Sequence, residues 1–314
     1  MKVVIARTLP AAGLEKLTAR FDVEVGGLPF DRDWLLAHVP GAAAIVADPT
    51  VPVDGQLLDL AGESLQVVSN FAVGFDNIDT DAVHDRGLRA TNTPGVLTNA
   101  TAELAVTLML AAGRRVVETD GIFRRGEWVG WEPEQFLGRE LSAATVGLVG
   151  FGRIGQRVAE LLTGFGAKLV LSDPHPPPVA AKLGAQAMEL AELLAVSDYV
   201  SLHVNLTSAT KHLLNAETLA LCKPGAILVN TCRGGVVDTA ALVDALRNGP
   251  LAAAGLDVYE NEPAVPADLA ALPNTVLVPH IGSATQVTRN AMATLCADNV
   301  IAVLGGERPL TPIV

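Results

Sequence analysis

Short apolar runs alternate with amphipathic stretches in the N-terminal part of the chain. Five runs that are short, apolar and often β-branched predict strands over Lys2–Ala6, Phe21–Val25, Ala43–Val46, Leu65–Ser69 and Leu88–Thr91. The stretches between them repeat apolar residues at helical spacing and predict helices over Ala11–Arg20, Asp31–His38, Val53–Leu60 and Asp79–Arg86. Because strands that alternate with helices assemble into parallel sheets, a sheet covered by helices on both faces is expected.

A second alternation follows a long apolar helix pattern from Ala100 to about Val117 and a broken segment over Gly126–Pro133. Its predicted strands are Thr145–Val149, Lys168–Ser172, Tyr199–His203, Ala226–Asn230, Ala252–Asp257 and Val276–Val278. Its predicted helices are Ile154–Phe165 and Thr239–Arg247, and a last helix over Thr285–Leu304 leads back to the first half. We therefore predict an α/β fold of two doubly wound parallel-sheet domains. Residues 98–285 form a domain inserted into a flavodoxin-like substrate domain of residues 1–97 and 286–314.

Composition narrows the class of protein. Half of the 314 residues are hydrophobic and 18% are charged, which excludes a disordered or fibrous chain. A formal net charge of −12 without a basic cluster argues against nucleic acid or a membrane surface as partner. The three cysteines fit a reducing compartment, no signal peptide is recognised, and the longest apolar run, near Leu104–Gly113, is about half of a membrane span. We expect a cytoplasmic protein without a metal site, since no cluster of ligand residues has metal spacing.

A glycine-rich turn follows the predicted strand Thr145–Val149, and Gly150, Gly152 and Gly155 give it the pattern G-x-G-x-x-G. Between a strand and a helix, the first glycine permits a tight turn, the second lets the backbone approach a pyrophosphate, and the third lets the helix pack on the strand. The next strand ends at Asp173, whose carboxylate would accept hydrogen bonds from the adenosine ribose and repel a 2′-phosphate. The inserted domain is thus predicted to be a Rossmann-type domain that binds NAD(H) in preference to NADP(H); the alternative is a glycine-rich turn with a capping aspartate.

Three polar residues follow predicted strands of the inserted domain: Arg233, Glu262 and His280. Ligands of open α/β sheets bind outside the carboxyl ends of the strands, so these side chains are expected to meet there. Arginine binds a carboxylate bidentately, histidine transfers protons near neutral pH, and a neighbouring carboxylate orients the imidazole. A single residue of these types is more often a solvated or structural group. Together, the three suit hydride transfer to a 2-keto acid with His280 donating the proton.

Three longer segments resemble the D-isomer-specific 2-hydroxyacid dehydrogenases, and the similarity runs over nearly the whole chain. The segments are Asn70–Asp79, Thr93–Glu103 and Pro279–Thr285, and they are most similar to the glyoxylate/hydroxypyruvate reductase branch. The resemblance implies that Arg233 binds the substrate carboxylate, that His280 is the acid/base and that Glu262 is the partner of His280.

The resemblance also implies further binding residues and a partner. Backbone amides of Val73 and Gly74 would complete the carboxylate site, with Ser283 nearby. Further residues would line the cofactor, namely Thr101, Arg153, Ile154, Thr231, Cys232, Asp257 and Gly282, with Asp257 facing the nicotinamide amide. In the reductase branch, the second tryptophan of a Trp-x-x-Trp-x-Pro segment reaches into the partner subunit's site. Trp128 and Trp131 match that segment, so Trp131 is the candidate and a homodimer is implied.

The predicted function is NADH-dependent reduction of a small 2-keto acid, glyoxylate or hydroxypyruvate, to the 2-hydroxy acid. One alternative is another dehydrogenase of the family, such as a 3-phosphoglycerate dehydrogenase. Against it, no regulatory domain is recognised and Asn70-Phe71-Ala72 lacks an arginine for a phosphate. The second alternative is an NAD(H)-sensing corepressor similar to the C-terminal-binding proteins. Against that reading, the sequence shows no long flexible tail and the trio of polar residues is complete.

Overall fold

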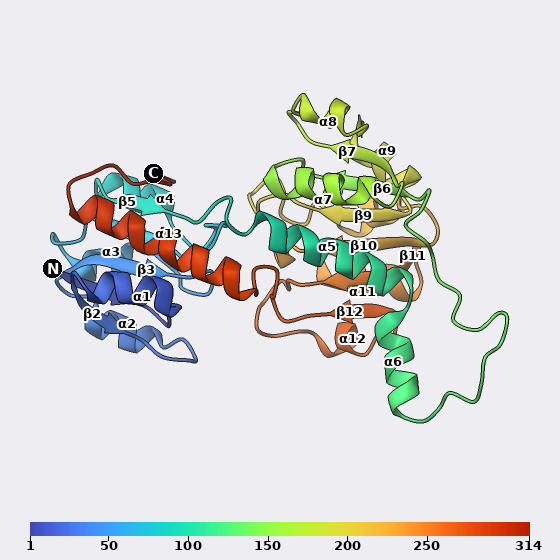
Figure 1. Cartoon of the computed structure of the whole chain (residues 1–314), viewed down its shortest axis with the longest axis horizontal. Coiled ribbons are helices and arrows are strands. Elements are labelled where there is room, and N and C mark those ends of the chain that lie inside the picture. The colour runs from blue at the N-terminus through green and yellow to red at the C-terminus, as the bar shows by residue number, and fades with distance from the viewer. The chain divides into compact units, whose positions relative to one another are not determined.

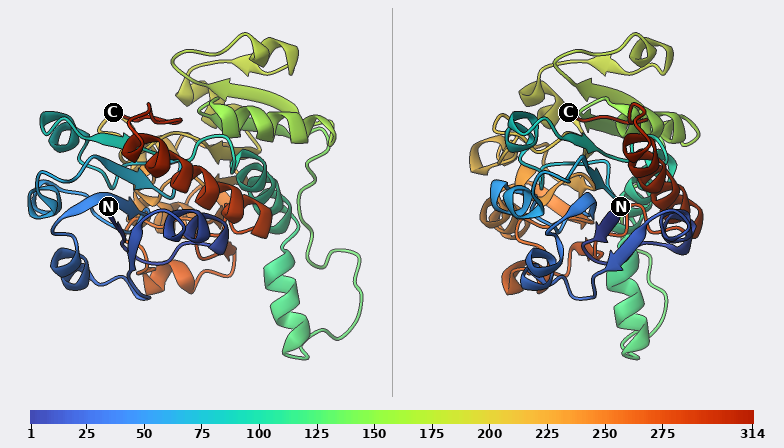
Figure 2. Two further views of the ribbon diagram at one scale, coloured as in Figure 1. Left: turned by 60° about the vertical axis from the view of Figure 1, so that its left-hand side comes forward. Right: turned by 90° about the vertical axis from the view of Figure 1, so that its left-hand side faces the viewer.

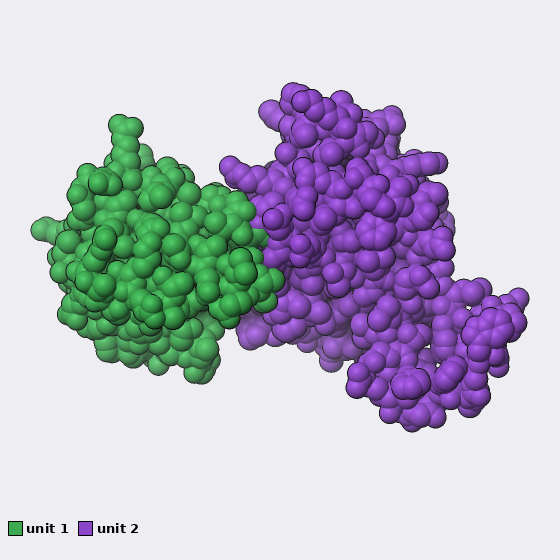
Figure 3. Space-filling model, viewed as in Figure 1, with its two compact units in different colours: residues 1–97, 283–314 green, residues 98–282 purple.

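Two separate parallel sheets organise the computed structural model, which describes residues 1–314. The five-stranded sheet belongs to unit 1, made of Met1–Leu97 and Ser283–Val314, and the seven-stranded sheet belongs to unit 2, Thr98–Gly282. Figure 3 gives each unit its own colour. Unit 2 is thus inserted into unit 1, and the predicted class of two doubly wound parallel-sheet α/β domains is confirmed.

Unit 1 has the strand order β2-β1-β3-β4-β5, which is the flavodoxin-like order, and all of its pairs are parallel. Its strands are β1 (Lys2–Ile5), β2 (Asp22–Val25), β3 (Ala42–Ala47), β4 (Val67–Asn70) and β5 (Arg89–Thr91). Its helices are α1 (Ala11–Thr18), α2 (Arg32–His38), α3 (Gly55–Ala61), α4 (Thr80–Asp85) and α13 (Gln286–Leu304). Every residue of β3 is buried, because a central parallel strand is covered on both faces.

Three helices of unit 1 begin one residue later than the hydrophobic pattern predicts. Asp31, Asp79 and Thr285 are predicted as the first helical residues, but each is an N-cap. The side-chain oxygen of each cap accepts the backbone N–H three residues later, at 3.0, 2.9 and 3.2 Å. A capping residue has extended backbone outside the helix, so periodicity alone places the boundary one residue early.

Helix α13 completes unit 1 from a distant part of the sequence. Its buried side chains, among them Met292 and Cys296, pack on α1 and β4. The side chain of Asn299 accepts the N–H of Thr311 at 3.0 Å, and the Thr311 hydroxyl donates to the carbonyl of Asn92 at 2.6 Å. The residues after α13 therefore fix the end of β5 and the loop that follows it.

Unit 2 has the strand order β12-β11-β10-β9-β6-β7-β8, a Rossmann order extended by one strand. Its strands are β6 (Thr145–Val149), β7 (Lys168–Ser172), β8 (Gln186–Ala187), β9 (Tyr199–Leu202), β10 (Ala226–Asn230), β11 (Leu251–Leu256) and β12 (Thr275–Leu277). Its helices are α5 (Thr98–Gly113), α6 (Val116–Arg124), α7 (Arg153–Thr163), α8 (Val179–Lys182), α9 (Leu190–Val196), α10 (Ala216–Leu219), α11 (Thr239–Arg247) and α12 (Ala267–Ala270), with a 3₁₀ turn η1 (Gly234–Val236).

The helices of unit 2 cover both faces of its sheet (Figure 1). Buried residues of α5 and α7 pack on one face, and those of α9 and α11 pack on the other. The sequence pattern does not predict β8, α8, α9, α10 or α12; β8 has two residues and three of these helices have four, too few for a period to show. The length and apolar character that a membrane-spanning helix requires are met by none of the helices.

The helix predicted from Ala100 to about Val117 is interrupted. Helix α5 ends at Gly113, and Arg115 takes a left-handed backbone with φ of +54° before α6 begins. The carbonyl of Gly113 accepts the N–H of Arg139 at 2.7 Å, and a Cβ on Gly113 would lie 2.2 Å from the Tyr199 hydroxyl oxygen. A tertiary contact, which no local pattern records, therefore ends the helix.

Helix α6 and the segment after it, residues 116–138, stand away from the sheet of unit 2 and are called the arm (Figure 2). The arm exposes large apolar side chains, namely Val116, Val117, Phe123, Trp128, Val129, Trp131 and Leu137. Its base is held by Arg139, whose guanidinium pairs with the carboxylate of Asp198. That carboxylate also accepts the Lys223 ammonium at 2.8 Å and the Thr145 N–H at 2.9 Å. The arm is thus anchored at one end and exposed over its length.

Candidate active site

The glycine-rich turn joins β6 to α7 as predicted, and each glycine has a different steric environment. Gly150 has φ of +89°, and a Cβ there would lie 2.7 Å from the carbonyl oxygen of His203. A Cβ on Gly155 would lie 2.5 Å from the carbonyl oxygen of Gly150, so only glycine lets α7 approach the turn this closely. A Cβ on Gly152 would meet nothing within 4 Å. The turn is therefore tight on its protein side and open where the first amides of α7 are exposed.

Asp173 follows β7 and faces this turn. Its carboxylate accepts the N–H of Phe151 at 2.7 Å and the N–H of His175 at 2.9 Å. Arg153 and Ile154 are the first residues of α7; Arg153 is exposed and Ile154 packs partly on the core. The structure therefore brings together the predicted residues of the turn and its acidic neighbour.

The loop after β10 carries Arg233 and is shaped by Asn230, the buried last residue of that strand. The Asn230 amide donates to the Arg233 carbonyl at 2.9 Å, and its oxygen accepts the N–H of Cys232 at 3.0 Å. The Arg233 guanidinium donates to the carbonyl of Cys232 at 2.8 Å. Burial raises the pKa of the Cys232 thiol to about 11, which keeps the thiol neutral and a poor nucleophile.

His280 and Glu262 form a hydrogen-bonded pair, with 2.7 Å between Nδ1 and Oε2. The other oxygen of Glu262 accepts the N–H of Tyr259 at 2.9 Å. Burial alone would raise the pKa of Glu262, but the hydrogen bond and charge of His280, with the Tyr259 N–H and the charge of Arg233, hold it below its usual value. An ionised Glu262 accepts the Nδ1–H of His280, so Nε2 is the nitrogen left to exchange a proton with a ligand.

His280 also has an unusual backbone conformation, since its φ of +52° is rare for a residue with a side chain. Its N–H donates to the carbonyl of the buried Asp257 at 2.9 Å. The Asp257 carboxylate accepts the N–H groups of Ile281 at 2.6 Å and Gly282 at 2.8 Å. Burial raises the pKa of Asp257, although these N–H groups and His280 oppose the rise. Thr101 donates to the Gly282 carbonyl at 3.2 Å, so these predicted residues lie together around the histidine.

In unit 1, the loop after β4 presents two backbone amides. The carbonyl of Val73 accepts the side-chain amide of Asn92 at 2.7 Å, and the carbonyl of Gly74 accepts that of Asn70 at 2.9 Å. With their carbonyl groups held in this way, the N–H groups of Val73 and Gly74 donate no hydrogen bond. The two amides are therefore oriented and available to an anion. Ser283 belongs to the same unit, as the first residue after the insertion.

The predicted tryptophans lie in the arm of unit 2. Trp128 is 48% exposed and stands 6.1 Å from Phe123 between ring centroids, whereas Trp131 is 80% exposed. The arm itself therefore does not bury Trp131.

Four residues of these loops are missing from the sequence-based prediction: Asn70, Asn92, Asn230 and Tyr259. The asparagines end or directly follow β4, β5 and β10. An asparagine at the carboxyl end of a buried parallel strand is a signal that sequence reasoning can use, because it has to find a backbone partner. Tyr259 gives no such signal, since only the folded loop shows its contacts.

Comparison with known proteins places this geometry in a family. Residues 106–282 match the family model described as D-isomer specific 2-hydroxyacid dehydrogenase, NAD binding domain. A glyoxylate reductase from Thermococcus litoralis is 46% identical over an alignment of 315 positions, and the alignment covers 98% of this chain and 95% of that protein. The chain belongs to the D-isomer-specific 2-hydroxyacid dehydrogenase family. The predicted family is thus confirmed.

Solved structures agree with this membership of the dehydrogenase family. A protein from Thermus thermophilus has a TM-score of 0.94 and 46% identity, and the match covers 100% of both chains. An NADPH-dependent glyoxylate/hydroxypyruvate reductase from Sinorhizobium meliloti, in complex with NADP and malonate, has a TM-score of 0.89 and 35% identity; the match covers 100% of this chain and 96% of that one.

Unit 2 of this dehydrogenase carries the NAD-binding domain of the family, and its residues fit a dinucleotide. The turn is open at Gly152. Beside it, both ring nitrogens of His203 are buried without a hydrogen-bond partner, as is the hydroxyl of Thr231 after β10. Burial lowers the pKa of His203 to about 4, so the imidazole is neutral. No three His, Cys, Asp or Glu side chains are grouped to hold a metal ion.

Proposed function

We propose that this dehydrogenase reduces glyoxylate, hydroxypyruvate or both to the corresponding 2-hydroxy acid with NADH. The observation that carries the proposal is the His280–Glu262 pair, with Nδ1 and Oε2 2.7 Å apart and the charge of Arg233 acting on the same carboxylate. A proton donor and a guanidinium at the carboxyl edge of one sheet are what a 2-keto acid requires.

Each member of the trio has a separate task in this proposal. Arg233 binds the substrate carboxylate with its planar guanidinium. His280 donates a proton from Nε2 to the keto oxygen, and Glu262 stabilises the imidazolium form that precedes this transfer. The positive charges of His280 and Arg233 stabilise the negative charge that develops on the substrate oxygen.

The amides of Val73 and Gly74 are proposed to complete the carboxylate site, with Ser283 nearby. Support comes from their N–H groups, which donate no hydrogen bond while Asn92 and Asn70 hold the adjoining carbonyls.

On the cofactor side, bound NADH would supply the hydride for reduction of the keto carbon. We propose that Gly150, Gly152, Gly155 and the start of α7 receive its pyrophosphate and that Asp173 binds the adenosine ribose. Further residues are proposed to line this site, namely Thr101, Arg153, Ile154, Thr231, Cys232, Asp257 and Gly282. Asp173 favours NADH because a 2′-phosphate beside a carboxylate is repelled.

A homodimer belongs to the same proposal. The arm exposes Trp131 and six other large apolar side chains, and a hollow of about 420 Å³ lies at its base, lined in part by Val117, Leu137 and Arg139. Exposed apolar surface of this kind marks an interaction site. A second copy of the chain would cover it and receive Trp131 near its substrate.

The direct test follows absorbance of the reduced nicotinamide with glyoxylate, hydroxypyruvate, pyruvate and 3-phosphohydroxypyruvate, each with NADH and with NADPH. Fast oxidation of NADH by either of the first two acids is expected. Preference for NADPH would refute the role of Asp173 and leave the chemistry intact. Preference for the phosphorylated acid would indicate a 3-phosphoglycerate dehydrogenase. Tight NADH binding without turnover of any acid would favour a sensor.

A further inference from the structure

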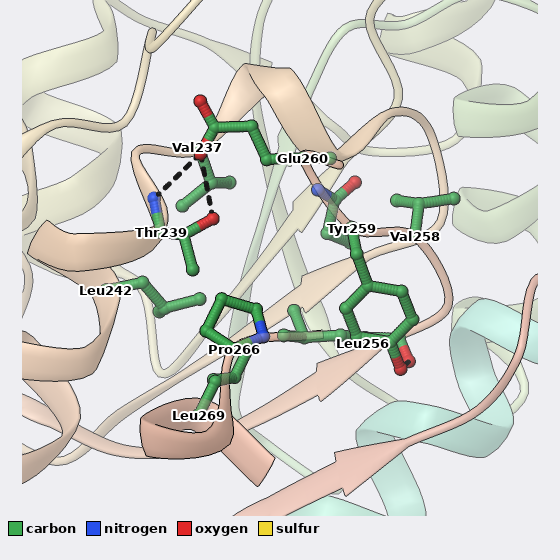
Figure 4. A pocket seen from close by; sticks show the side chains of 11 residues that line it. Val237, Thr239, Leu242, Leu256, Val258, Tyr259, Glu260, Pro266 and Leu269 are labelled. Atoms are coloured by element: carbon green, nitrogen blue, oxygen red, sulfur yellow. Dashed lines mark hydrogen bonds between the residues drawn. The ribbon is translucent and has the colours of Figure 1, made fainter. Parts of the chain in front are cut away.

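The loop Val258–Glu262 carries a second carboxylate, that of Glu260, whose hydrogen-bond partners are residues other than His280. Glu260 accepts a hydrogen bond from Nε2 of His212 at 2.6 Å and one from the Thr239 hydroxyl at 2.9 Å. Its contact with Thr239 is drawn in Figure 4. One residue, Asn261, separates Glu260 from Glu262, and the two carboxylates have different partners: Glu260 contacts His212 and Thr239, whereas Glu262 contacts His280.

Chemistry fixes the direction of these hydrogen bonds. Burial alone would raise the pKa of Glu260, but the hydrogen bonds from His212 and Thr239 and the charge of His212 lower it below its usual value. The carboxylate is therefore ionised near neutral pH and only accepts, so Nε2 of His212 donates. Thr239 is the first residue of α11, where a negative charge also interacts favourably with the helix N-terminus.

His212 also holds the loop that carries Arg233. Its backbone N–H donates to the carbonyl of Gly235 at 2.9 Å, and two residues later the N–H of Leu214 donates to Val236 at 3.1 Å. His212 itself has a left-handed backbone with φ of +49°. One residue therefore links the Arg233 loop, through its main chain, to the Glu262 loop, through its side chain.

Packing leaves these two loops little room to shift. A Cβ on Gly234 would lie 1.9 Å from the carbonyl carbon of Tyr259, so the loops touch through their backbones. The cavity beneath them in Figure 4, lined by Leu242, Leu256 and Leu269 among others, has a volume of only about 10 Å³, room for about one water molecule. The Tyr259 hydroxyl donates to the carbonyl of Val278 at 3.0 Å, two residues before His280.

We propose that His212 and Glu260 are positioning residues that hold Glu262 against His280 and keep the Glu262 and Arg233 loops in register. The inference rests on the proposed roles of Arg233, Glu262 and His280. Charged groups that face His280 within unit 2 are Glu262 and Asp257, with Arg233 acting on Glu262; Glu260 instead faces His212. Glu260 therefore acts through loop geometry and not through its own charge at the imidazole.

The test compares Glu260→Ala, Glu260→Gln and, as a matched control, Glu192→Ala, an exposed carboxylate of α9 with no hydrogen bond. For Glu260→Ala, we expect kcat to fall about 10- to 100-fold and KM for the keto acid to change less than about three-fold, because a misplaced acid/base pair slows the chemical step. Glu260→Gln keeps an oxygen for Thr239 and an amide group that can hydrogen-bond to the His212 imidazole, so it should recover most of kcat. Glu192→Ala should match the parent chain.

A readout independent of turnover is the distance from His280 Nδ1 to Glu262 Oε2 in crystals of each variant. We expect this distance, 2.7 Å in the parent chain, to lengthen beyond hydrogen-bond range in Glu260→Ala and to be kept in Glu260→Gln. An unchanged distance with unchanged kcat would overturn the inference, as would a loss confined to KM. Should the parent chain reduce no keto acid, the proposed function fails while the distance still decides this inference. Should Glu260→Ala not fold, His212→Ala against His212→Gln, which keeps a donor, decides it.

Discussion

In the proposed reaction, Arg233 binds the substrate carboxylate and His280 transfers a proton. Substitutions at these two residues should therefore affect different kinetic constants. Arg233→Ala should mainly raise KM for the keto acid, by about ten-fold or more, because a hydrogen bond to a charged group contributes about 1.5–3 kcal/mol. His280→Ala should mainly lower kcat, by about 10²- to 10⁴-fold, the usual contribution of a general acid. Steady-state kinetics on both variants measure the two effects.

Arg247→Ala is a suitable control for the arginine, because Arg247 forms an exposed ion pair with Asp268 in the same unit. It should leave both constants unchanged. Equal and small effects from Arg233→Ala and His280→Ala would contradict the division of tasks.

The placement of Arg233, Glu262 and His280 near one another could be predicted because each of these side chains follows a strand of one parallel sheet. What could not be predicted is how they are held. Asn230, Tyr259 and the Glu260–His212 contact involve segments that are distant in sequence, and their hydrogen bonds appear only once the loops have packed. Local sequence patterns identify the residues at the ends of strands, but they do not identify the hydrogen-bond partners of those residues.

At the scale of elements, two glycines of the turn between β6 and α7 are expected to have different roles, one in packing and one in cofactor binding. Gly155→Ala should lower the free energy of unfolding by about 1–3 kcal/mol, because its Cβ would press on the Gly150 carbonyl oxygen at 2.5 Å. Gly152→Ala is the matched variant, since its Cβ meets no protein atom within 4 Å. It should keep the melting temperature of the parent chain and weaken NADH binding.

Thermal melts and NADH titrations by fluorescence distinguish these two outcomes. A Gly152→Ala protein that binds NADH as tightly as the parent would show that the open side of the turn is not where the dinucleotide lies.

The contacts of Asp198 with Arg139, Lys223 and Thr145, at the base of the arm, should make the free energy of unfolding depend on pH. Burial alone would raise the pKa of Asp198, but Lys223, the Thr145 N–H and Arg139 lower it below the ordinary value of 3.8. A lowered pKa in the folded state contributes stability that is complete above the unfolded-state value and is lost as the pH falls through the folded-state value. Asp198→Asn should therefore lower the free energy of unfolding near pH 7 by about 1–3 kcal/mol.

Urea unfolding of the two proteins from pH 7 downward checks this sign. The gap between them should stay constant until the pH approaches 3.8 and should narrow below it. A gap that widens on acidification would contradict the role assigned to Lys223 and Arg139.

Element boundaries were predictable to about one turn, and the errors have physical causes. N-caps shift the starts of α2, α4 and α13, whereas a tertiary contact at Gly113 divides the long apolar helix into α5 and α6. Capping can be read from Asp, Thr and the spacing that follows them; the contact of Gly113 with Arg139 and Tyr199 cannot.

At the scale of the whole molecule, the exposed apolar side chains of the arm lead us to expect association of two copies of the chain. Trp131→Ala should raise KM for the keto acid and weaken the proposed dimer, because the second copy would bury this 80% exposed tryptophan. Sedimentation velocity and steady-state kinetics measure both effects. Leu28→Ala, which removes another exposed apolar side chain at 64% exposure, should change neither. A parent chain that sediments as a monomer with full activity would contradict this expectation.

The alternation of strands and helices was enough to predict two parallel sheets and the insertion of one domain in the other. Local sequence patterns do not by themselves predict the strand orders. Short connections and right-handed crossovers, which are general in parallel sheets, leave only a few possible orders once the elements are known.

Because unit 2 is inserted into unit 1, the two units become complete at different times during translation. Unit 2 is contiguous in the chain and can complete its sheet as soon as it leaves the ribosome, whereas unit 1 waits for α13 and the residues after it. Those last residues hold Asn92, and Asn92 holds the Val73 carbonyl. The loop that we propose to bind the substrate carboxylate can therefore take its final form only after α13 and the residues that follow it have been synthesised, later than the last residue of unit 2.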